Sequence, residues 1–177
     1  EVNWPKDAKY VEVVANGEAL TVRNADAFKL STADEHHLYT IQDNRPTNFF
    51  WTCGSHQGYP AVQANTMRTD DSQLFYFMEG EDAKHFHIYT AKDEPLDYVS
   101  GKAITAWNAT TTETCDYVQY GVAECGEFEL IFVEGQTTRY GLRIDGDYIC
   151  TRGTSHGADV NMRWVIRDYS GFNAATL

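Results

Sequence analysis

The stretch from Gln73 to Gly101, QLFYFMEGEDAKHFHIYTAKDEPLDYVSG, decides the fold because the chain contains a second copy of it. The copy is EFELIFVEGQTTRYGLRIDGDYICTRG, from Glu127 to Gly153. Each copy reads as an aromatic strand ending in Glu-Gly, a polar turn, an alternating strand, a second turn, and Asp-Tyr at the start of a third strand. Matching features lie about 50 residues apart, which is a period typical of repeat architectures.

Short strands with turn residues between them fill the rest of the chain. No window has the three-and-four spacing of apolar residues that a helix needs, whereas β-branched and aromatic residues alternate throughout. Asn16-Gly17 predicts a tight hairpin near the N-terminus. The other strands are expected near residues 37–42, 49–53, 61–65, 73–78, 85–90, 97–101, 103–108, 128–133, 140–144, 147–152 and 162–168. We expect a third strand of the last unit within 154–160, where the pattern is weak.

These strands predict an all-β fold of three related four-stranded units. A strand pair cannot bury its apolar face alone, so the units must pack around a shared core with pseudo-threefold symmetry. We expect this domain to cover residues 36–168, with an N-terminal strand or hairpin segment (1–35) packed on it and a tail (169–177). The second unit carries an extra piece at 109–127.

Composition excludes some classes of partner. The 177 residues include 26 Asp and Glu against 14 Lys and Arg, a net charge of −12. A nucleic-acid partner is not expected, because phosphate binding depends on clustered basic residues. No apolar run is long enough for a transmembrane segment. Four cysteines in an acidic, aromatic, β-rich chain fit an exported or cell-surface protein.

The segment Gly58 to Phe77, GYPAVQANTMRTDDSQLFYF, resembles the ricin-type lectin domains of the β-trefoil superfamily. The likeness lies in a glycine, a short strand of Val-Gln type, a polar turn, and a closing Gln-x-aromatic motif, here Gln73-Leu74-Phe75. The resemblance implies a β-trefoil without catalytic activity or cofactor, and a glycan or glycoprotein as partner. In such domains an aromatic ring stacks on the apolar face of the sugar, and amides bond its hydroxyls. Carried to matching positions, this implies the carbohydrate-binding residues Trp107, Asn108, Gln63, Asn65 and Gln73. The second strands lack the carboxylate that the family has there.

Two other functions stay open. One is a protein-binding or protease-inhibiting trefoil that acts through the loop 109–127, where Cys115 and Cys125 lie ten residues apart and could close a disulfide-bonded hairpin. Reduced thiols are the alternative reading of these cysteines. The other function is that of an accessory domain in a larger surface protein.

Motifs that suggest chemistry have simpler interpretations. Gly153 to Gly157 matches the GxSxG pattern of hydrolases, but the pattern needs a following helix and a downstream histidine, and no histidine follows. His85 and His87 share one face of a strand, as metal ligands can, but the sequence identifies no third ligand. Asp145-Gly146-Asp147 lacks the oxygen ligands that a calcium loop places next. We therefore expect no catalytic residues and no metal site.

Overall fold

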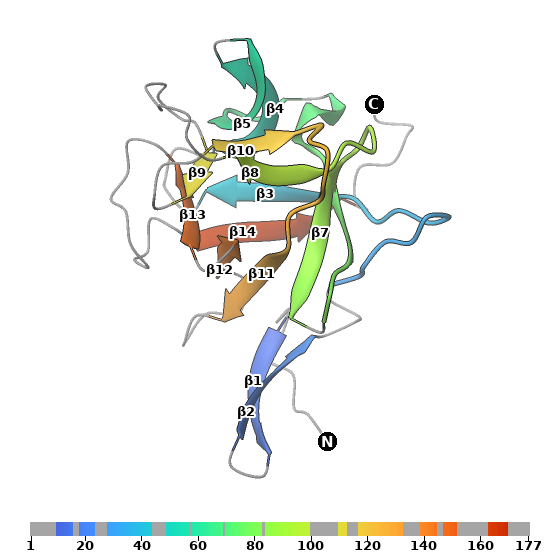
Figure 1. Cartoon of the computed structure of the whole chain (residues 1–177), viewed down its shortest axis with the longest axis vertical. Helices are drawn as coiled ribbons and strands as arrows, with labels where there is room; N and C mark the ends of the chain where they lie inside the picture. Colours follow the sequence, from blue (N-terminus) through green and yellow to red (C-terminus); the bar gives the residue numbers. More distant parts are fainter. Residues whose placement is uncertain are drawn as a thin grey trace.

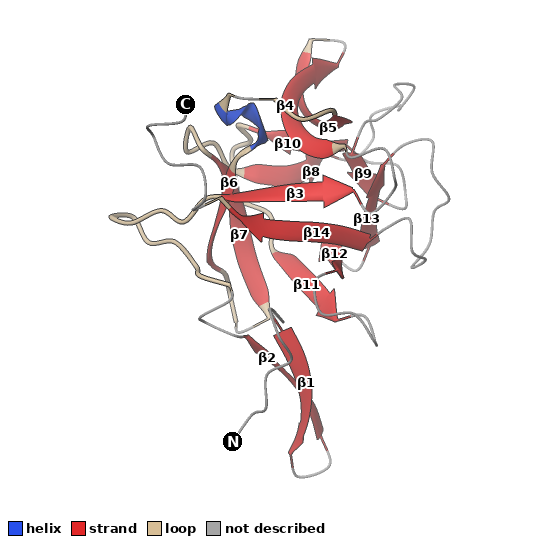
Figure 2. Ribbon diagram, turned by 180° about the vertical axis from the view of Figure 1, so that it is seen from behind, coloured by secondary structure: helices blue, strands red, loops and turns tan. Residues whose placement is uncertain are grey.

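The computed structural model describes residues 10–15, 18–23, 28–43, 49–56, 58–68, 70–82, 84–99, 110–112, 117–132, 139–144, 147–151 and 163–169. Within these ranges the chain is all β, as predicted, with one three-residue 3₁₀ turn, η1 (Asp71–Gln73) (Figure 2). The strands are β1 (Tyr10–Ala15), β2 (Glu18–Arg23), β3 (Tyr39–Asp43), β4 (Phe50–His56), β5 (Tyr59–Asn65), β6 (Phe75–Glu79), β7 (His85–Thr90), β8 (Leu96–Val99), β9 (Thr110–Thr112), β10 (Tyr117–Tyr120), β11 (Phe128–Phe132), β12 (Arg139–Ile144), β13 (Asp147–Thr151) and β14 (Arg163–Asp168).

Six strands close into a barrel. β3 pairs with β6, β6 with β7, β7 with β11, β11 with β12, β12 with β14, and β14 returns to β3, each pair antiparallel. Closure removes the exposed edges that an open sheet would have. The repeat supplies the strands in equivalent pairs: Phe75–Glu79 is followed by His85–Thr90, and Phe128–Phe132 by Arg139–Ile144. The repeated stretches therefore build the barrel.

Three strand pairs cap one end of the barrel (Figure 1). β4 pairs with β5 along its whole length, β8 pairs with β10, and β13 pairs with β9. The caps also touch one another: β9 pairs with β10, and the hydroxyl of Tyr120 donates to the carbonyl of Gly54 at 2.8 Å. A barrel with three caps confirms the predicted arrangement of three related units.

The core lies inside the barrel and under the caps, and it is largely aromatic. Trp51 of a cap and Trp164 of the barrel are both fully buried, with ring centroids 5.4 Å apart in an edge-to-face arrangement that suits aromatic quadrupoles. Trp164 also donates from Nε1 to the carbonyl of Ile149 at 3.2 Å, which ties the third cap to the barrel. Phe28 is fully buried, with its ring 4.9 Å from that of Phe77. That burial stabilises the fold by roughly 2–3 kcal/mol.

The N-terminal hairpin formed by β1 and β2 is present, as its Asn-Gly turn predicted. Its register runs from Tyr10 opposite Arg23 to Ala15 opposite Glu18, and it projects from the end of the barrel away from the β4–β5 cap (Figure 1). The segment that follows belongs to the barrel itself, because Phe28 is a core residue and the amide of Ser31 donates to the carbonyl of Phe77 at 2.6 Å.

The expectation that 109–127 of the second unit is an extra loop is wrong. We expected residues 103–108, which lie outside the described residues, to be the third strand and 109–127 to be an extra loop. In the structure the strand that pairs with β8 is β10, which lies inside that supposed loop, and Val118 of β10 is fully buried in the core. Thr110–Thr112 of the same segment pairs with β13. The physical reason is edge pairing. An unpaired strand edge leaves backbone N–H and C=O groups without partners, and here β10 covers an edge of β8 while β9 covers an edge of β13.

Candidate functional site

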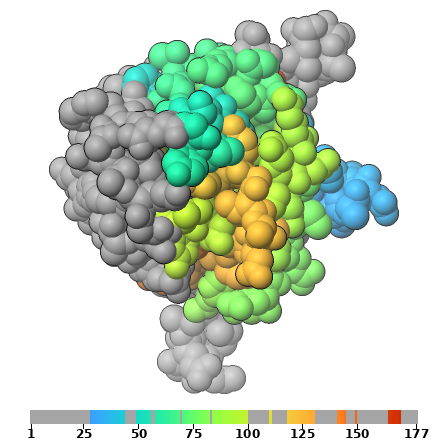
Figure 3. All heavy atoms as spheres, turned by 45° about the horizontal axis from the view of Figure 1, so that its top comes forward, coloured from blue at the N-terminus to red at the C-terminus, as the bar shows by residue number. Residues whose placement is uncertain are grey.

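A pocket of about 430 Å³ opens between the barrel and the second cap. Its lining comes from the β6–β7 turn, β7, β8, β11, the segment just before β11 and the end of β12; the residues are Glu81, His85, Asp97, Tyr98, Cys125, Gly126, Glu127, Glu129 and Ile144. We call it the acidic pocket. Figure 3 shows this face, with the segment that leads from β10 into β11 (orange) bordered by residues of β7 and β8 (yellow-green).

Glu127 links two walls of the acidic pocket. Its Oε2 accepts from the backbone N–H of Glu81 at 3.1 Å, and its Oε1 pairs with Nε2 of His87. The turn leaves room for this carboxylate because residue 80 is glycine: a Cβ there would lie 2.5 Å from Oε2 of Glu127 and 2.6 Å from the backbone carbonyl of His85. The carboxylate of Glu127 is therefore held in one orientation, with 31% of the side chain exposed.

Glu129 lies in the same wall of the acidic pocket and is more buried than Glu127. Strand register places it opposite His85 on β7 and opposite Arg143 on β12, so the three side chains form a row across the barrel surface. Nε of Arg143 donates to Oε1 of Glu129 at 2.6 Å, and only 15% of the Glu129 side chain is exposed. The pair fixes the position of the carboxylate.

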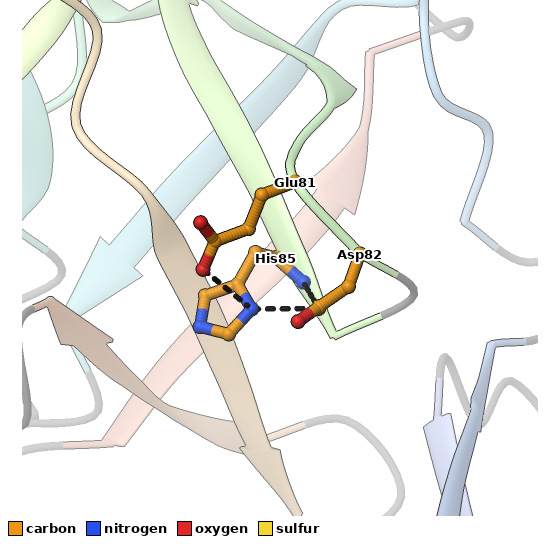
Figure 4. Close-up of side chains that lie close together, drawn as sticks. All are labelled: Glu81, Asp82 and His85. Atoms are coloured by element: carbon orange, nitrogen blue, oxygen red, sulfur yellow. Dashed lines mark hydrogen bonds and ion pairs between the residues drawn. The ribbon is translucent and has the colours of Figure 1, made fainter.

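His85 sits in a small acidic cluster at the rim (Figure 4). Its Nδ1 lies 2.7 Å from Oδ1 of Asp82 and 3.8 Å from Oε1 of Glu81. Burial by itself would lower the pKa of His85, but the hydrogen bond and charge of Asp82, with the charges of Glu129 and Glu81, raise it above 6.5. The same contact, with the backbone N–H of Lys84, lowers the pKa of Asp82.

Glu81, Asp82 and His85 form a group that could hold a metal ion, and it differs from the pair His85 and His87 that the sequence suggested. Their ligand atoms lie within 4.8 Å of one another, and Glu81 and Asp82 are exposed. The nitrogen of His85 that faces the acids already hydrogen-bonds Asp82, so a His–Asp pair in a turn accounts for the geometry. We assign no metal here.

Asp97 and Gly126 form the opposite side of the acidic pocket. Oδ1 of Asp97 accepts from the backbone N–H of Tyr98 at 2.8 Å. A Cβ on Gly126 would lie 2.6 Å from Oδ1 of Asp97 and 2.6 Å from Cδ1 of Ile144, so glycine keeps this space open. Register places Gln119 directly opposite Asp97. Gln119 is only 7% exposed, and its Nε2 has no hydrogen-bond partner in the described part of the chain.

Three of the predicted carbohydrate-binding residues, Gln63, Asn65 and Gln73, do not line this pocket. Gln63 and Asn65 lie on β5 of the first cap, both partly exposed, and Gln63 Nε2 donates to the carbonyl of Ser55 at 3.4 Å. Trp107 and Asn108 lie outside the described residues, so their role stays a prediction.

Gln73 is a structural residue, which corrects the expectation that it bonds a sugar. The side chain is 4% exposed. Its Nε2 donates to Oγ1 of Thr52 at 2.9 Å and to the carbonyl of Thr66 at 2.8 Å, while its Oε1 accepts from the backbone N–H of Arg68 at 2.8 Å. The amide closes the turn before η1 and ties it to β4, and a surface ligand has no access to it.

Cys125 is a free thiol in the structure, in contrast to the disulfide with Cys115 considered above; Cys115 lies outside the described residues. Its Sγ lies 2.7 Å from the hydroxyl of Tyr89. The hydrogen bond to Cys125, helped by burial, raises the pKa of Tyr89 to about 12.

Solved structures resembling this chain are β-trefoil proteins, which confirms the predicted fold. A designed threefold-symmetric protein, ThreeFoil, matches with a TM-score of 0.50 at 13% identity over 74% of this chain and 98% of its own. SeviL, solved bound to asialo-GM1 saccharide, matches with a TM-score of 0.50 at 12% identity over 76% of this chain and 98% of its own. A mosquitocidal holotoxin matches with a TM-score of 0.52 at 13% identity over 81% of this chain, which spans 18% of the toxin.

Comparison by sequence gives a different result: no protein-family model matches, and no curated protein matches. In the described ranges, no helix is long and apolar enough to cross a membrane. The similarity between this chain and the solved structures is therefore a similarity of backbone fold and not of sequence.

Proposed function

We propose that this chain, a β-trefoil by its architecture and its structural neighbours, is a carbohydrate-binding domain of an exported or cell-surface protein, and that the acidic pocket is its main sugar site. The observation that carries the proposal is the set of oriented carboxylates in that pocket, on Asp97, Glu127 and Glu129. Sugar hydroxyls are strong donors to carboxylates, and such charge-assisted bonds are about twice as strong as neutral ones. The sequence has no acid at the position on the second strands where the lectin family has one, and here the acids come from two other places, the start of β8 and the segment that enters β11.

The pocket also offers apolar contact. Tyr98 is partly exposed, so a pyranose can place its C–H face against this ring while its hydroxyls meet the acids. A volume of about 430 Å³ suits a small ligand such as one or two sugar rings. Binding of saccharide by SeviL, a protein with a similar backbone, supports this class of ligand.

A second sugar contact is proposed at the segment that carries Trp107 and Asn108, with Gln63 and Asn65 of β5 as polar partners. This rests on the sequence resemblance alone. We do not propose a protein-binding role for 109–127, because β9 and β10 of that segment pair within the caps and the connection 121–127 leads directly into β11, with Gly126 and Glu127 in the wall of the acidic pocket.

The test is a glycan array followed by titration calorimetry with the saccharides that bind. Asp97→Asn keeps the acceptor for the N–H of Tyr98 but removes the charge, and we expect at least about tenfold weaker binding. Glu35→Gln is the matched control, since Glu35 is an exposed acid that does not line the acidic pocket and whose carboxylate lies 3.7 Å from Nε2 of His37. Trp107→Ala tests the second contact separately. The proposal fails if no saccharide binds, or if Asp97→Asn binds as tightly as the control.

A further inference from the structure

Two histidines of β7 hold neighbouring segments of the chain through carboxylates. His85 and His87 lie two residues apart on one strand, so both side chains point to the outer face of the barrel. Nδ1 of His85 lies 2.7 Å from Oδ1 of Asp82, in the turn before β7. Nε2 of His87 pairs with Oε1 of Glu127, in the segment that enters β11. The two imidazole side chains are 24% and 27% exposed, so they can exchange protons with solvent.

The carboxylate of Glu127 connects three segments of the chain. Its Oε1 contacts His87 of β7, and its Oε2 accepts from the backbone N–H of Glu81 in the turn at 3.1 Å. The preceding residue, Gly126, donates its backbone N–H to the carbonyl of Leu96 on β8 at 2.8 Å. The contact between Glu127 and His87 therefore holds both the turn and the segment before β11 against β7.

The charged groups around these two pairs are mostly acids. Arg143 supplies one positive charge through its pair with Glu129. While both imidazoles are neutral, four carboxylates and one guanidinium give a charge of −3, and protonation of both imidazoles reduces it to −1. Protonation therefore replaces part of the repulsion between the acids by attraction between opposite charges. The four carboxylates belong to Glu81, Asp82, Glu127 and Glu129.

Other side chains on the same elements do not reverse this balance. Lys84 in the turn and Glu124 before β11 are both exposed and carry opposite charges. Asp97 of β8 adds one more negative charge on the other side of the acidic pocket. The remaining neighbours on this face are Met78, which lies opposite His87 on β6, and Tyr89 and Cys125, which bond each other.

We propose that the pairs His85–Asp82 and His87–Glu127 form a pH-sensitive latch, which holds the turn 80–82 and the segment 124–127 against β7 more firmly when the two histidines are protonated. Between about pH 5.5 and 7.5, histidine is the side chain that ordinarily changes its charge. Because Glu81, Gly126 and Glu127 line the acidic pocket, the latch makes two walls of that pocket firmer in acid. The latch does not depend on the proposed function and needs no ligand.

The experiment measures amide hydrogen exchange by NMR at pH 5.5 and 7.5, in low salt with a chelator present and each rate corrected for intrinsic exchange at that pH. The reporters are the N–H of Glu81, which bonds Glu127, and the N–H of Gly126, which bonds Leu96. We expect the protection of both amides to be at least about threefold greater at pH 5.5, and this gain to shrink at 0.5 M salt as the charges are screened. The N–H of Asp43, bonded to the carbonyl of Phe49 at 2.8 Å in a turn without histidine, should not change.

Variants locate the effect. The double variant His85→Gln and His87→Gln keeps a polar side chain at both positions but has no titrating imidazole there, so the difference between the two pH values should disappear. His37→Gln is the matched control, because His37 also lies beside an acid, Glu35, at 3.7 Å, but belongs to neither pair. This control should keep the full difference.

Four results would overturn the latch. The first is equal protection of Glu81 and Gly126 at the two pH values. The second is an equal change at Asp43, which would show that acid stabilises the whole domain and not these segments. The third is a pH dependence that persists in the double variant. The fourth, which uses the unmodified protein and so holds even if the double variant does not fold, is a pH dependence of the same size at 0.5 M salt.

Discussion

Replacing Gln73 by methionine tests whether this residue builds the fold or binds the sugar. Methionine has nearly the same volume, so the change removes hydrogen bonds without leaving a large cavity. Three bonds are lost, from Nε2 to Thr52 and Thr66 and from the N–H of Arg68 to Oε1. At about 1 kcal/mol each, the free energy of unfolding should fall by about 3 kcal/mol. For a domain of this size that is a decrease in Tm of about 6–12 °C.

The assay is urea denaturation followed by tryptophan fluorescence, with Gln63→Met as the matched control. Gln63 is a partly exposed glutamine with one long bond of 3.4 Å, so its change should cost less than about 0.5 kcal/mol. The affinity of the folded Gln73→Met protein for saccharide should equal that of the unmodified protein. The reasoning is refuted if Gln73→Met unfolds at the same urea concentration as the control, or if it loses saccharide binding while its stability is unchanged.

Three further predictions concern Gly80, His85 and Cys53. Gly80→Ala should destabilise the protein by about 1–3 kcal/mol in the same assay, because its Cβ would press on the backbone carbonyl of His85; an unchanged midpoint would contradict the close approach. Because the pKa of His85 is raised in the folded state, protonated His85 stabilises the fold below about pH 6.5, and this stabilisation is lost as the pH rises through the folded-state pKa. Because the pKa of Asp82 is lowered, ionised Asp82 stabilises the fold above about pH 4, and this stabilisation is lost as the pH falls through its folded-state pKa. The stability difference between the unmodified protein and His85→Gln should therefore be greatest between about pH 4 and 6.5, and a difference independent of pH would contradict it. Burial, helped by the charge of Glu94, raises the pKa of Cys53 to about 12, so iodoacetamide at pH 8 should label Cys53 at least about 100-fold more slowly in the folded than in the unfolded protein; equal rates would show that this thiol is accessible.

The barrel could be predicted from the sequence because its strands repeat. The side chains of His85–Thr90 alternate between partly exposed and buried, and the predicted bounds of this strand match those in the structure; Glu79-Gly80 marks the end of Phe75–Glu79. Core strands repeat because they meet equivalent neighbours in each unit. The cap of the second unit could not be predicted, since a short connection after β8 to residues 103–108 is the more common choice, whereas the pairing strand is Tyr117–Tyr120.

No pattern in the sequence predicts the acidic pocket. Glu81, Asp97, Glu127 and Glu129 lie up to 48 residues apart in the numbering, in turns and strand starts where acids are common and have no distinctive spacing. Only the closure of the barrel, which pairs β7 with β11, brings them to one opening. The resemblance to lectin domains pointed instead to Gln73, because the position is shared, and the structure shows that its amide serves the fold.

The most direct test of the account is a map of amide chemical-shift changes as a saccharide found on the array is added to the ¹⁵N-labelled protein. We predict that the largest changes fall on Asp97, Tyr98, Gly126 and Glu127, and that Asp97→Asn removes them while Glu35→Gln does not. Changes confined to residues outside the acidic pocket would contradict the assignment of the sugar site to it, and an array without any bound saccharide would contradict the proposed function.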